Sequence, residues 1–357
     1  MKTLSLRDLQ TKAKVVAVTS VTIAILFLFL SPFAFMIFTS LKTQEQITTI
    51  GSPIWPSKVA DHEYNGAQLE VFTVPMNSCQ GSETDSANKN LAIVKKGLRE
   101  STFVDPDDPD RGEFVCAIAW RSLERPWEFS ASFANFKEVW VTIPGTFPRV
   151  LWNTIFYALT TVIGTLISCT IVAYGFSRFR FPGRDFLFIV LISTIFLPAF
   201  VTVIPTYTFF QKIGWVGTWL PLIVPAFFAN AYNVFLLRQY FMTMPRELDE
   251  AAMIDGAGPW KILWTVIIPQ SYPVLLVVTV FHIVYAWNDF FGPLIYLSTN
   301  RDAWPISVAL QTYNGIYGQK PQLIQSGALM AMIAPLILFI FAQRFFVQGI
   351  VITGVEK

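Results

Sequence analysis

The residues best suited to do chemistry form a short acidic segment between two long apolar stretches. Glu247, Asp249 and Glu250 fall in or just beyond the first turn of a predicted helix, where carboxylates favour the positive end of the helix dipole. Gly256 is placed to end that helix as a C-terminal cap. Ala251 and Ala252 give a smooth surface that the groove of a partner could approach closely. The chemistry we expect is ionic docking, with Glu250 as the charged anchor, and not catalysis.

Helical spacing divides this segment into two stripes. One stripe contains Leu248, Ala251, Ala252 and Asp255, and the other contains Glu247, Glu250 and Ile254. The residues alone leave two interpretations open. The helix lies across a partner, or it is a solvated loop helix that packs on its own bundle.

Catalysis and metal binding have no support in the sequence. The chain has no Gly-x-x-x-x-Gly-Lys-Ser/Thr phosphate loop, so it cannot hold ATP in that way. Its only histidines are His62 and His282, which excludes a histidine-rich metal site. The acidic run 105–110 lacks the glycine and the distal glutamate of an EF-hand loop, so we interpret it as a solvated turn. We predict no catalytic residue, no metal ligand and no cofactor in this chain.

The distribution of charge predicts a polytopic membrane protein. Only 14% of the residues are charged, against roughly a quarter in a soluble domain. Six windows lack Asp, Glu, Lys and Arg, and each is long enough for a spanning helix of about 20 residues. These windows are 15–41, 150–177, 186–211, 213–237, 262–288 and 321–343. We predict an all-α fold with six transmembrane helices, the first a retained span and not a signal peptide.

Basic residues near the windows predict the orientation in the membrane. Most of them fall on one side, whereas the short loops on the other side hold only Lys212, Arg301 and Lys320. Both termini are therefore predicted to be cytoplasmic. The segment around Glu250 would lie on the cytoplasmic side as well.

A long loop at 43–148 separates the first two windows and holds 15 of the 24 acidic residues. Its alternating runs 69–74 and 114–120 predict strands. Cys79 and Cys116 both lie in this loop and would form a disulfide in an oxidising compartment; two unrelated free cysteines are the alternative. We predict a small β-rich extracytoplasmic insert. The predicted division is 1–42 for the N-terminus and first span, 43–148 for the insert, and 149–357 for a core of five spans.

Two longer patterns carry a resemblance to a known family. Glu250-Ala251-Ala252, three further residues and Gly256, followed by the run 266–269 that ends in Pro269, resemble the EAA signature of ABC importer permeases. The segments 173–184, 286–290 and 343–355 are similar to other parts of the family. Within it, the chain most resembles the carbohydrate importers, and specifically the six-span second permease subunits of maltose-type transporters. The resemblance covers residues 1–50 and about 130–357.

The resemblance implies the type I ABC importer fold and a role as one half of a permease heterodimer. Two copies of a cytoplasmic ATPase, which bind ATP and Mg, would each receive a coupling helix. An extracytoplasmic binding protein would deliver a sugar or oligosaccharide, maltose-like or trehalose-like, across a bacterial or archaeal cell membrane. Membrane lipid is expected as a partner and nucleic acid is not. The resemblance assigns ATPase coupling, within the loop 245–269, to Glu247, Glu250, Ala251, Ala252, Ile254, Asp255, Gly256 and Pro269.

Polar residues near the end of the fifth window are candidates for the substrate path. Tyr285, Asn288 and Asp289 lie in a segment from which related permeases contact sugar, and polar residues at membrane depth often mark a pathway. The alternative is that Asn288 and Asp289 cap the helix at the outer interface.

The loop 298–325 corresponds to a family loop that enters the sugar cleft of the binding protein. Its candidate contacts are Gln311, Tyr313, Asn314 and Tyr317. Aromatic rings and amides suit sugar contact, and they equally suit an interfacial belt. Both interpretations stay open.

Two other functions compete with an importer permease. A secondary transporter that works without an ATPase would need buried acids for a coupling ion, and the charge-free windows hold none. A membrane-bound enzyme would need a clustered nucleophile or metal set at the interface, and the sequence offers none.

Overall fold

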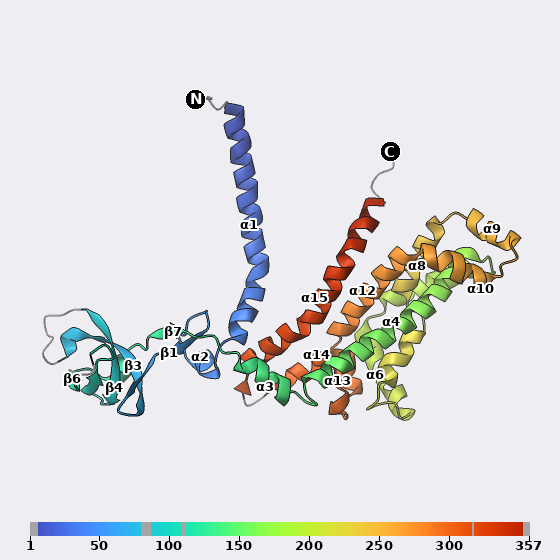
Figure 1. The fold of residues 1–357 in the computed structure, drawn as a ribbon. Helices are drawn as coiled ribbons and strands as arrows, with labels where there is room; N and C mark the ends of the chain where they lie inside the picture. Colours follow the sequence, from blue (N-terminus) through green and yellow to red (C-terminus); the bar gives the residue numbers. More distant parts are fainter. Residues whose placement is uncertain (1–5, 80–86, 109–111, 316–317, 353–357) are drawn as a thin grey trace. The chain divides into compact units, whose positions relative to one another are not determined.

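The computed structural model comprises two compact units, whose elements are labelled in Figure 1. The structure describes residues 6–79, 87–108, 112–315 and 318–352. The first unit contains residues 1–138 and 320–326, and the second contains residues 139–319 and 327–357.

An antiparallel sheet with the strand order β2-β3-β4-β5-β6 forms much of the first unit. Its register sets Val71 opposite Ala92 and Ser101 opposite Cys116. A separate ribbon pairs β1 with β7. The strands are β1 (Ser57–Val59), β2 (Asp61–Tyr64), β3 (Ala67–Pro75), β4 (Asn88–Lys95), β5 (Ser101–Val104), β6 (Phe114–Cys116) and β7 (Trp127–Phe129).

The core of this sheet is formed by inward-facing residues of the adjacent strands β3, β4 and β5. Phe72, Leu91 and Phe103 are buried there, as expected when successive side chains point to opposite faces. Cys79 and Cys116 lie in the same core and are joined by a disulfide with an S–S distance of 1.98 Å. The disulfide thus joins two core residues that are 37 residues apart in the sequence.

Two local expectations for this region are met only in part. The strand expected at 114–120 ends at Cys116, because the N–H of Ala117 donates to the carbonyl of Ser78 at 2.7 Å and the chain turns away. The turn expected within 105–110 forms, and Asp107 and Asp108 in it are exposed. The carboxylate of Asp105, however, is buried and pairs with Lys89.

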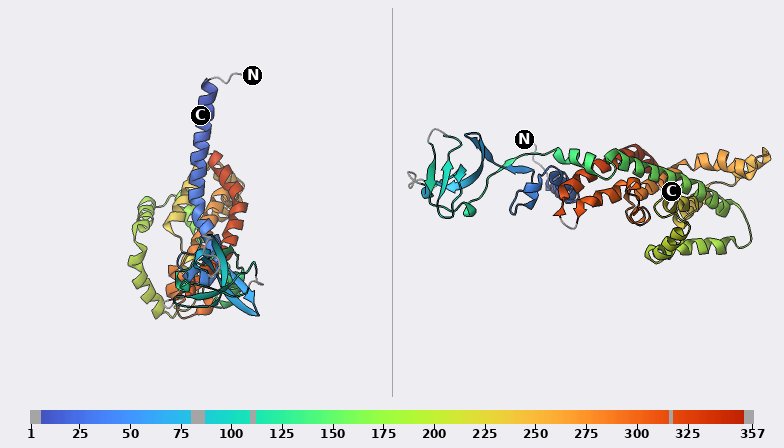
Figure 2. Two further views of the ribbon diagram at one scale, coloured as in Figure 1. Left: turned by 90° about the vertical axis from the view of Figure 1, so that its left-hand side faces the viewer. Right: turned by 90° about the horizontal axis from the view of Figure 1, so that it is seen from below.

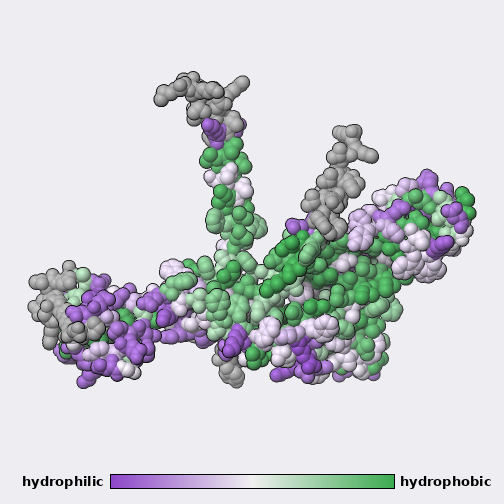
Figure 3. All heavy atoms as spheres, in the orientation of Figure 1, coloured by the Kyte–Doolittle hydropathy of each residue, from purple (hydrophilic) through white to green (hydrophobic). Residues whose placement is uncertain are grey.

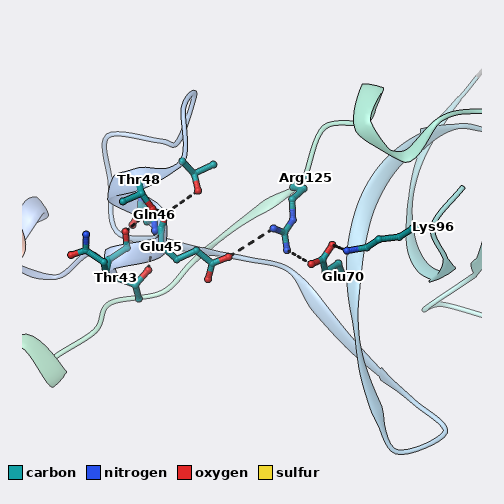
Figure 4. A network of polar contacts seen from close by, with 9 residues as sticks. Thr43, Glu45, Gln46, Thr48, Glu70, Lys96 and Arg125 are labelled. Carbon is teal, nitrogen blue, oxygen red and sulfur yellow. Dashed lines mark hydrogen bonds and ion pairs between the residues drawn. The ribbon is translucent and has the colours of Figure 1, made fainter. Parts of the chain in front are cut away.

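Helix α2 (Gln44–Thr48) is attached to the strands by the polar contacts in Figure 4. Arg125 lies 3.8 Å from carboxylate oxygens of both Glu45 and Glu70. The buried Gln46 exchanges two hydrogen bonds with Ser57, of 2.7 and 3.0 Å. Because exposed ion pairs contribute little, Gln46 is the main polar attachment.

The C-terminal end of α1 (Leu6–Ser40) is also anchored within the first unit. The amide of Asn135 donates to the carbonyls of Ser40 and Lys42 at 2.7 and 2.8 Å, and the hydroxyl of Ser326 donates to Ser40 at 3.2 Å. A helix end leaves carbonyls without intrahelical partners, and these donors satisfy that of Ser40 together with the carbonyl of Lys42 just beyond the helix.

The second unit is helical. Its helices are α4 (Phe147–Arg178), α5 (Arg184–Ser193), α6 (Ala199–Lys212), α7 (Leu220–Ile223), α8 (Ala231–Thr243), α9 (Glu247–Ile254), α10 (Pro259–Ile262), α11 (Ile268–Gln270), α12 (Tyr272–Asn288), α13 (Phe291–Tyr296) and α14 (Ile306–Ala309). Two further helices, α3 (Ala134–Thr142) and α15 (Pro321–Ile352), have residues in both units. Figure 1 shows α9 and α10 at one end of this unit and α13 and α14 toward the other.

The described residues include four helical segments long and apolar enough to cross a membrane, and up to six if each bent pair counts as one span. The four segments are Lys14–Ser40, Phe147–Arg178, Leu220–Thr243 and Pro321–Gln343. The bent pairs are Arg184–Phe196 with Phe200–Lys212, at 99°, and Pro259–Gln270 with Tyr272–Asn288, at 78°. Figure 2 shows α5 and α6, in yellow-green, beside the other helices of the second unit.

The second bend has a local cause. A π-helical turn, η6 (Leu263–Ile267), precedes Pro269, and Ser271 follows as the junction with α12. π-turns and proline both interrupt the regular ladder of helical hydrogen bonds. The predicted span 262–288 is therefore two helices joined at an angle.

The core of the second unit lies where α4, α8 and η6 meet. Leu237, Phe241, Leu263 and Ile267 are fully buried there. Closer to the middle of α4, a Cβ on Gly164 would lie 2.8 Å from the ring of Phe227, so glycine permits the close approach. Figure 3 shows hydrophobic surface along these helices and a mixed, more hydrophilic surface around α9.

Candidate functional site

Helix α9 carries most of the predicted coupling residues and ends as the sequence indicates. Gly256 adopts a left-handed conformation with φ of 77°, and its N–H donates to the carbonyl of Met253 at 3.0 Å. The N–H of Ala257 then donates to the carbonyl of Ala252 at 2.9 Å. Glycine adopts this conformation without a steric cost, which makes it the usual residue at such an end.

The inner face of α9 consists of Leu248, Asp249 and Ala252. Asp249 is buried, and the other two are half-buried. Ala252 packs against the core formed by α4, α8 and η6. Of the stripe Leu248, Ala251, Ala252 and Asp255, the first and third residues are half-buried, whereas Ala251 and Asp255 are exposed. Ala252, which the resemblance assigns to ATPase coupling, therefore lies on the inner face.

A buried ion pair fixes this inner face to α4. The Nε of Arg178 lies 3.0 Å from Oδ2 of Asp249, and both side chains are nearly inaccessible. Arg178 also donates through Nη1 to the carbonyl of Met244 at 3.2 Å, and the hydroxyl of Tyr174 donates to the carbonyl of Pro259 at 3.2 Å. The end of α4 therefore holds the chain on both sides of α9.

The ion pair is incompletely hydrogen-bonded. Among the described residues, Oδ1 of Asp249 and Nη2 of Arg178 have no hydrogen-bond partner. Burial raises the pKa of the Asp249 carboxyl above its ordinary value, and the guanidinium groups of Arg178 and Arg246 offset part of that rise. Burial therefore disfavours the charged form of this carboxylate more than the two guanidinium groups favour it.

The outer face of α9 carries exposed acidic and apolar side chains. Glu247, Glu250 and Ala251 are exposed, and Ile254 is 87% exposed at the end of the helix. Met253, next to it, is more than half exposed. A carboxylate beside exposed apolar groups suits docking into a groove that offers both a basic residue and an apolar wall.

Pro269 does not share this surface. It lies in α11, at the bend between η6 and α12, and its side chain is exposed. The structure thus separates the two ends of the predicted coupling loop: the exposed residues of α9 form its outer face, and Pro269 marks the bend.

The three substrate-path candidates occupy different environments. The carboxylate of Asp289 accepts a hydrogen bond from the Tyr157 hydroxyl at 2.7 Å and another from the N–H of Gly292 at 3.2 Å. The amide of Asn288 donates to the carbonyl of Val284 in its own helix at 2.8 Å. Tyr285 is exposed and lines a cavity. The bond to Gly292 lies at the start of α13, so the Asp289 side chain caps the helix that follows and not the end of α12.

The candidate residues of the loop 298–325 also differ in exposure. Gln311 and Asn314 are exposed, and Asn314 begins a short hairpin of β8 (Asn314–Gly315) and β9 (Gly318–Gln319). Tyr313 is buried, and its hydroxyl lies 2.8 Å from Oγ1 of Thr142. Tyr317 lies outside the described residues.

Sequence reasoning missed the pairing of Arg178 with Asp249. Arg178 counts in the sequence only as one of the basic residues that predict orientation, and Asp249 only as an acid in a helical first turn. A usable signal was the position of Asp249 between Leu248 and Ala252, on the face that packs inward. The part of the chain that the structure describes contains no group of three or more His, Cys, Asp or Glu that could hold a metal ion.

Comparison with known proteins agrees with a transport role for this arrangement. Residues 161–352 match the sequence model of a family described as "Binding-protein-dependent transport system inner membrane component". The osmoprotective compounds uptake permease protein GgtD of Synechocystis sp. is 33% identical over 249 residues, which cover 69% of this chain and 83% of that protein. The arabinooligosaccharides transport system permease protein AraQ of Halalkalibacterium halodurans is 30% identical, with coverage of 57% and 72%.

A third relative transports a different kind of compound. The sn-glycerol-3-phosphate transport system permease protein UgpE of Brucella melitensis is 32% identical, with coverage of 57% of this chain and 73% of that protein. Among solved structures, a chain of a bacterial ABC transporter involved in the import of the acidic polysaccharide alginate has a similar fold, with a TM-score of 0.65. It shares 19% identity and covers 97% of this chain and 100% of its own.

Proposed function

The chain belongs to the family of binding-protein-dependent transport system inner membrane components, and on this premise we propose that α9 is the surface through which a partner ATPase drives transport. It is a permease subunit of an ABC importer. ATP hydrolysis is the task of a separate subunit, so this chain is not itself an enzyme. ATP and Mg belong, in this proposal, to the ATPase.

The observation that carries the proposal is the division of α9 into two faces. The outer face leaves Glu250 and Ile254 exposed, whereas the inner face is fixed to α4 by the ion pair of Arg178 and Asp249. A force applied to the outer face reaches α4 through a buried contact and through the packing of Ala252. Glu250 would pair with a basic residue of the ATPase.

The assembly we propose contains a second permease subunit, two copies of the ATPase and an extracytoplasmic binding protein. The chain would cross a bacterial or archaeal cell membrane six times, with both bent pairs counted as spans and both termini cytoplasmic. The division into 1–42, 43–148 and 149–357 is part of this proposal. Lipid surrounds the exposed apolar faces of the helices in the proposed assembly, and nucleic acid has no role.

The proposed substrate is a sugar or oligosaccharide. The name of AraQ, a permease for arabinooligosaccharides, supports this choice. On the outer side, we propose that the disulfide-linked sheet and the exposed Gln311 and Asn314 meet the binding protein. Tyr313, being buried, would hold the loop in position.

Site-specific cross-linking tests the ATPase contact. Ile254→Cys introduces an exposed thiol on the outer face, and Ala252→Cys introduces one on the inner face. The full complex, purified with its ATPase, should give a cross-link from Ile254→Cys and none from Ala252→Cys. Failure of the ATPase to co-purify, or equal cross-linking by both variants, would contradict the proposal.

A further inference from the structure

The segment Pro259–Gln270 runs across the direction of the helix that follows it. It consists of α10, the π-helical turn η6 and α11, and its axis makes an angle of 78° with that of α12. With 17 residues, α12 reaches the lower end of the roughly 17–25 residues that a spanning helix contains. Because α12 can cross the hydrocarbon by itself, the segment Pro259–Gln270 is free to lie nearly parallel to the membrane surface.

Two tryptophans lie on the outer face of this segment. Trp260 is 62% exposed and Trp264 is 58% exposed, and their spacing of four residues places both on one side of a helix. Lys261, also exposed, is the only charged residue of the segment. The opposite face is fixed in the protein, because Leu263 and Ile267 are fully buried in the core of the second unit. Exposed tryptophan beside lysine is typical of a helix at the level of lipid headgroups.

Trp264 also forms part of the wall of an apolar groove of about 200 Å³. Ile167 and Ile171 of α4 and Leu275 of α12 line the same groove. None of the described residues in its lining is charged, and Thr170 in it is buried. The volume is below the roughly 300–1,000 Å³ of compact small-molecule sites, so a narrow hydrocarbon chain fits it better than a polar solute.

The combination of these features indicates which molecule occupies the groove. A phospholipid joins a charged headgroup to apolar chains, and here a lysine and two tryptophans adjoin a groove that carries no charge. The surface that we assign to the ATPase has a different chemistry. Its exposed carboxylates lie on α9, whereas the segment Pro259–Gln270 contains no acidic residue.

We propose that a phospholipid of the cytoplasmic leaflet binds at this place, with one acyl chain in the groove between α4 and α12 and its headgroup beside Lys261. Trp260 and Trp264 lie at the level of the headgroups. The inference rests on the membrane topology in the proposed function and not on the ATPase contact. It assigns one lipid to a defined site, whereas the proposed function has lipid only as the surroundings of the helices.

Spin labels test whether the segment lies against lipid. Trp264→Cys and Leu98→Cys would be labelled in a Cys169→Ser background, in the complete transporter in nanodiscs of phosphatidylethanolamine and phosphatidylglycerol. Leu98, 75% exposed in the first unit, gives the reference for water. Oxygen partitions into lipid and a nickel chelate stays in water, so we expect the ratio of collisions with oxygen to collisions with nickel to be about tenfold higher at Trp264→Cys. Equal ratios would mean water, and few collisions with either reagent would mean a covering protein; both results would overturn the inference.

Photo-cross-linking tests the position of the acyl chain. Phosphatidylglycerol with a diazirine in one acyl chain should label α12 at and around Leu275. Ile167→Trp fills the groove and should lower that labelling about fivefold, because the chain loses buried apolar contact. Ile163→Trp, one turn earlier on the same exposed face of α4 and outside the lining of the groove, is the matched control and should label like the wild type.

Equal labelling of the two variants, or no label in α12, would overturn the inference. A failed cross-link between Ile254→Cys and the ATPase would instead sink the proposed function. Neither the collision ratio nor the diazirine labelling depends on that contact, so the two failures are distinguishable.

Discussion

The Nε of Arg178, the last residue of α4, lies 3.0 Å from Oδ2 of Asp249 in the first turn of α9. This contact joins a membrane-length helix to the surface that we assign to the ATPase. Both partners are buried, and neither is fully hydrogen-bonded among the described residues. A buried pair of this kind adds little net stability, but removing one partner is costly. Its value in this protein is the fixed position of α9.

Loss of the arginine should release α9. Arg178→Ala leaves Asp249 buried without its main counterion, which should destabilise the attachment by about 3 kcal/mol. Trypsin cleavage at Arg246 or Lys261, which flank α9, should then become faster. Arg180→Ala, an exposed arginine in the same region, is the matched control and should cleave at the wild-type rate. Equal cleavage of both variants would show that the ion pair does not hold the helix.

The stability of the protein should depend on pH through the titration of Asp249. Its pKa is raised by burial, so the folded state favours the protonated carboxyl. The stability from this group is therefore greatest below the ordinary pKa of 3.8 and declines as pH rises through the higher folded-state value. The thermal midpoint of the wild type, relative to Asp249→Asn, should fall as pH rises from that point toward neutrality. A difference that rises with pH would contradict this account.

The disulfide should stabilise the sheet of the first unit. Cys79 and Cys116 are 37 residues apart, and closing a loop of that length removes chain entropy worth about 4 kcal/mol. Replacing both cysteines with serine should make the sheet of the full-length protein more sensitive to protease, with the helices unaffected. Under non-reducing conditions in denaturant, a thiol reagent should label the wild type only at Cys169. Three labelled thiols would rule out the bond.

The close approach of α4 and the short helical turn η5 (Val224–Phe227) should depend on one glycine. Gly164→Ala would set a Cβ 2.8 Å from the Phe227 ring and 3.1 Å from the backbone of Ala226, and overpacking of this kind costs about 1–3 kcal/mol. Gly175→Ala, in the same helix, meets nothing within 4 Å. The first substitution should lower the thermal midpoint and the second should not. Equal midpoints would mean that η5 shifts without cost.

Local signals in the sequence predicted much of the candidate site. Carboxylates at the start of α9 and Gly256 after its end are properties of neighbouring residues, so the helix and its termination could be read directly. Which face of α9 packs inward could not be predicted in this way. It depends on Arg178, which is distant in the sequence and meets Asp249 only after α4 and α9 pack. Helical spacing alone therefore did not show that Ala252 packs inward while Ala251 stays exposed.

The spans show the same limit. Apolar length identifies the windows, and four of the predicted spans correspond to segments that qualify without a sharp bend. The 78° bend after η6 has a proline as its only visible signal, and proline occurs in many straight spans as well. The helix is also interrupted at Phe228–Asn230, just before α8, and this break lies inside the charge-free window 213–237, so the absence of charge does not reveal it.

The most direct test of the central claim is charge reversal at Glu250 in the reconstituted transporter. Glu250→Lys should leave the chain inserted and folded, because this side chain is exposed, but should repel a basic residue of the ATPase. Asp185→Lys, an exposed acid in the first turn of another helix, is the matched control. We predict that Glu250→Lys lowers uptake about a hundredfold while ATP hydrolysis continues without stimulation, and that the control transports normally. Wild-type uptake by Glu250→Lys would contradict the assignment of α9 as the coupling surface.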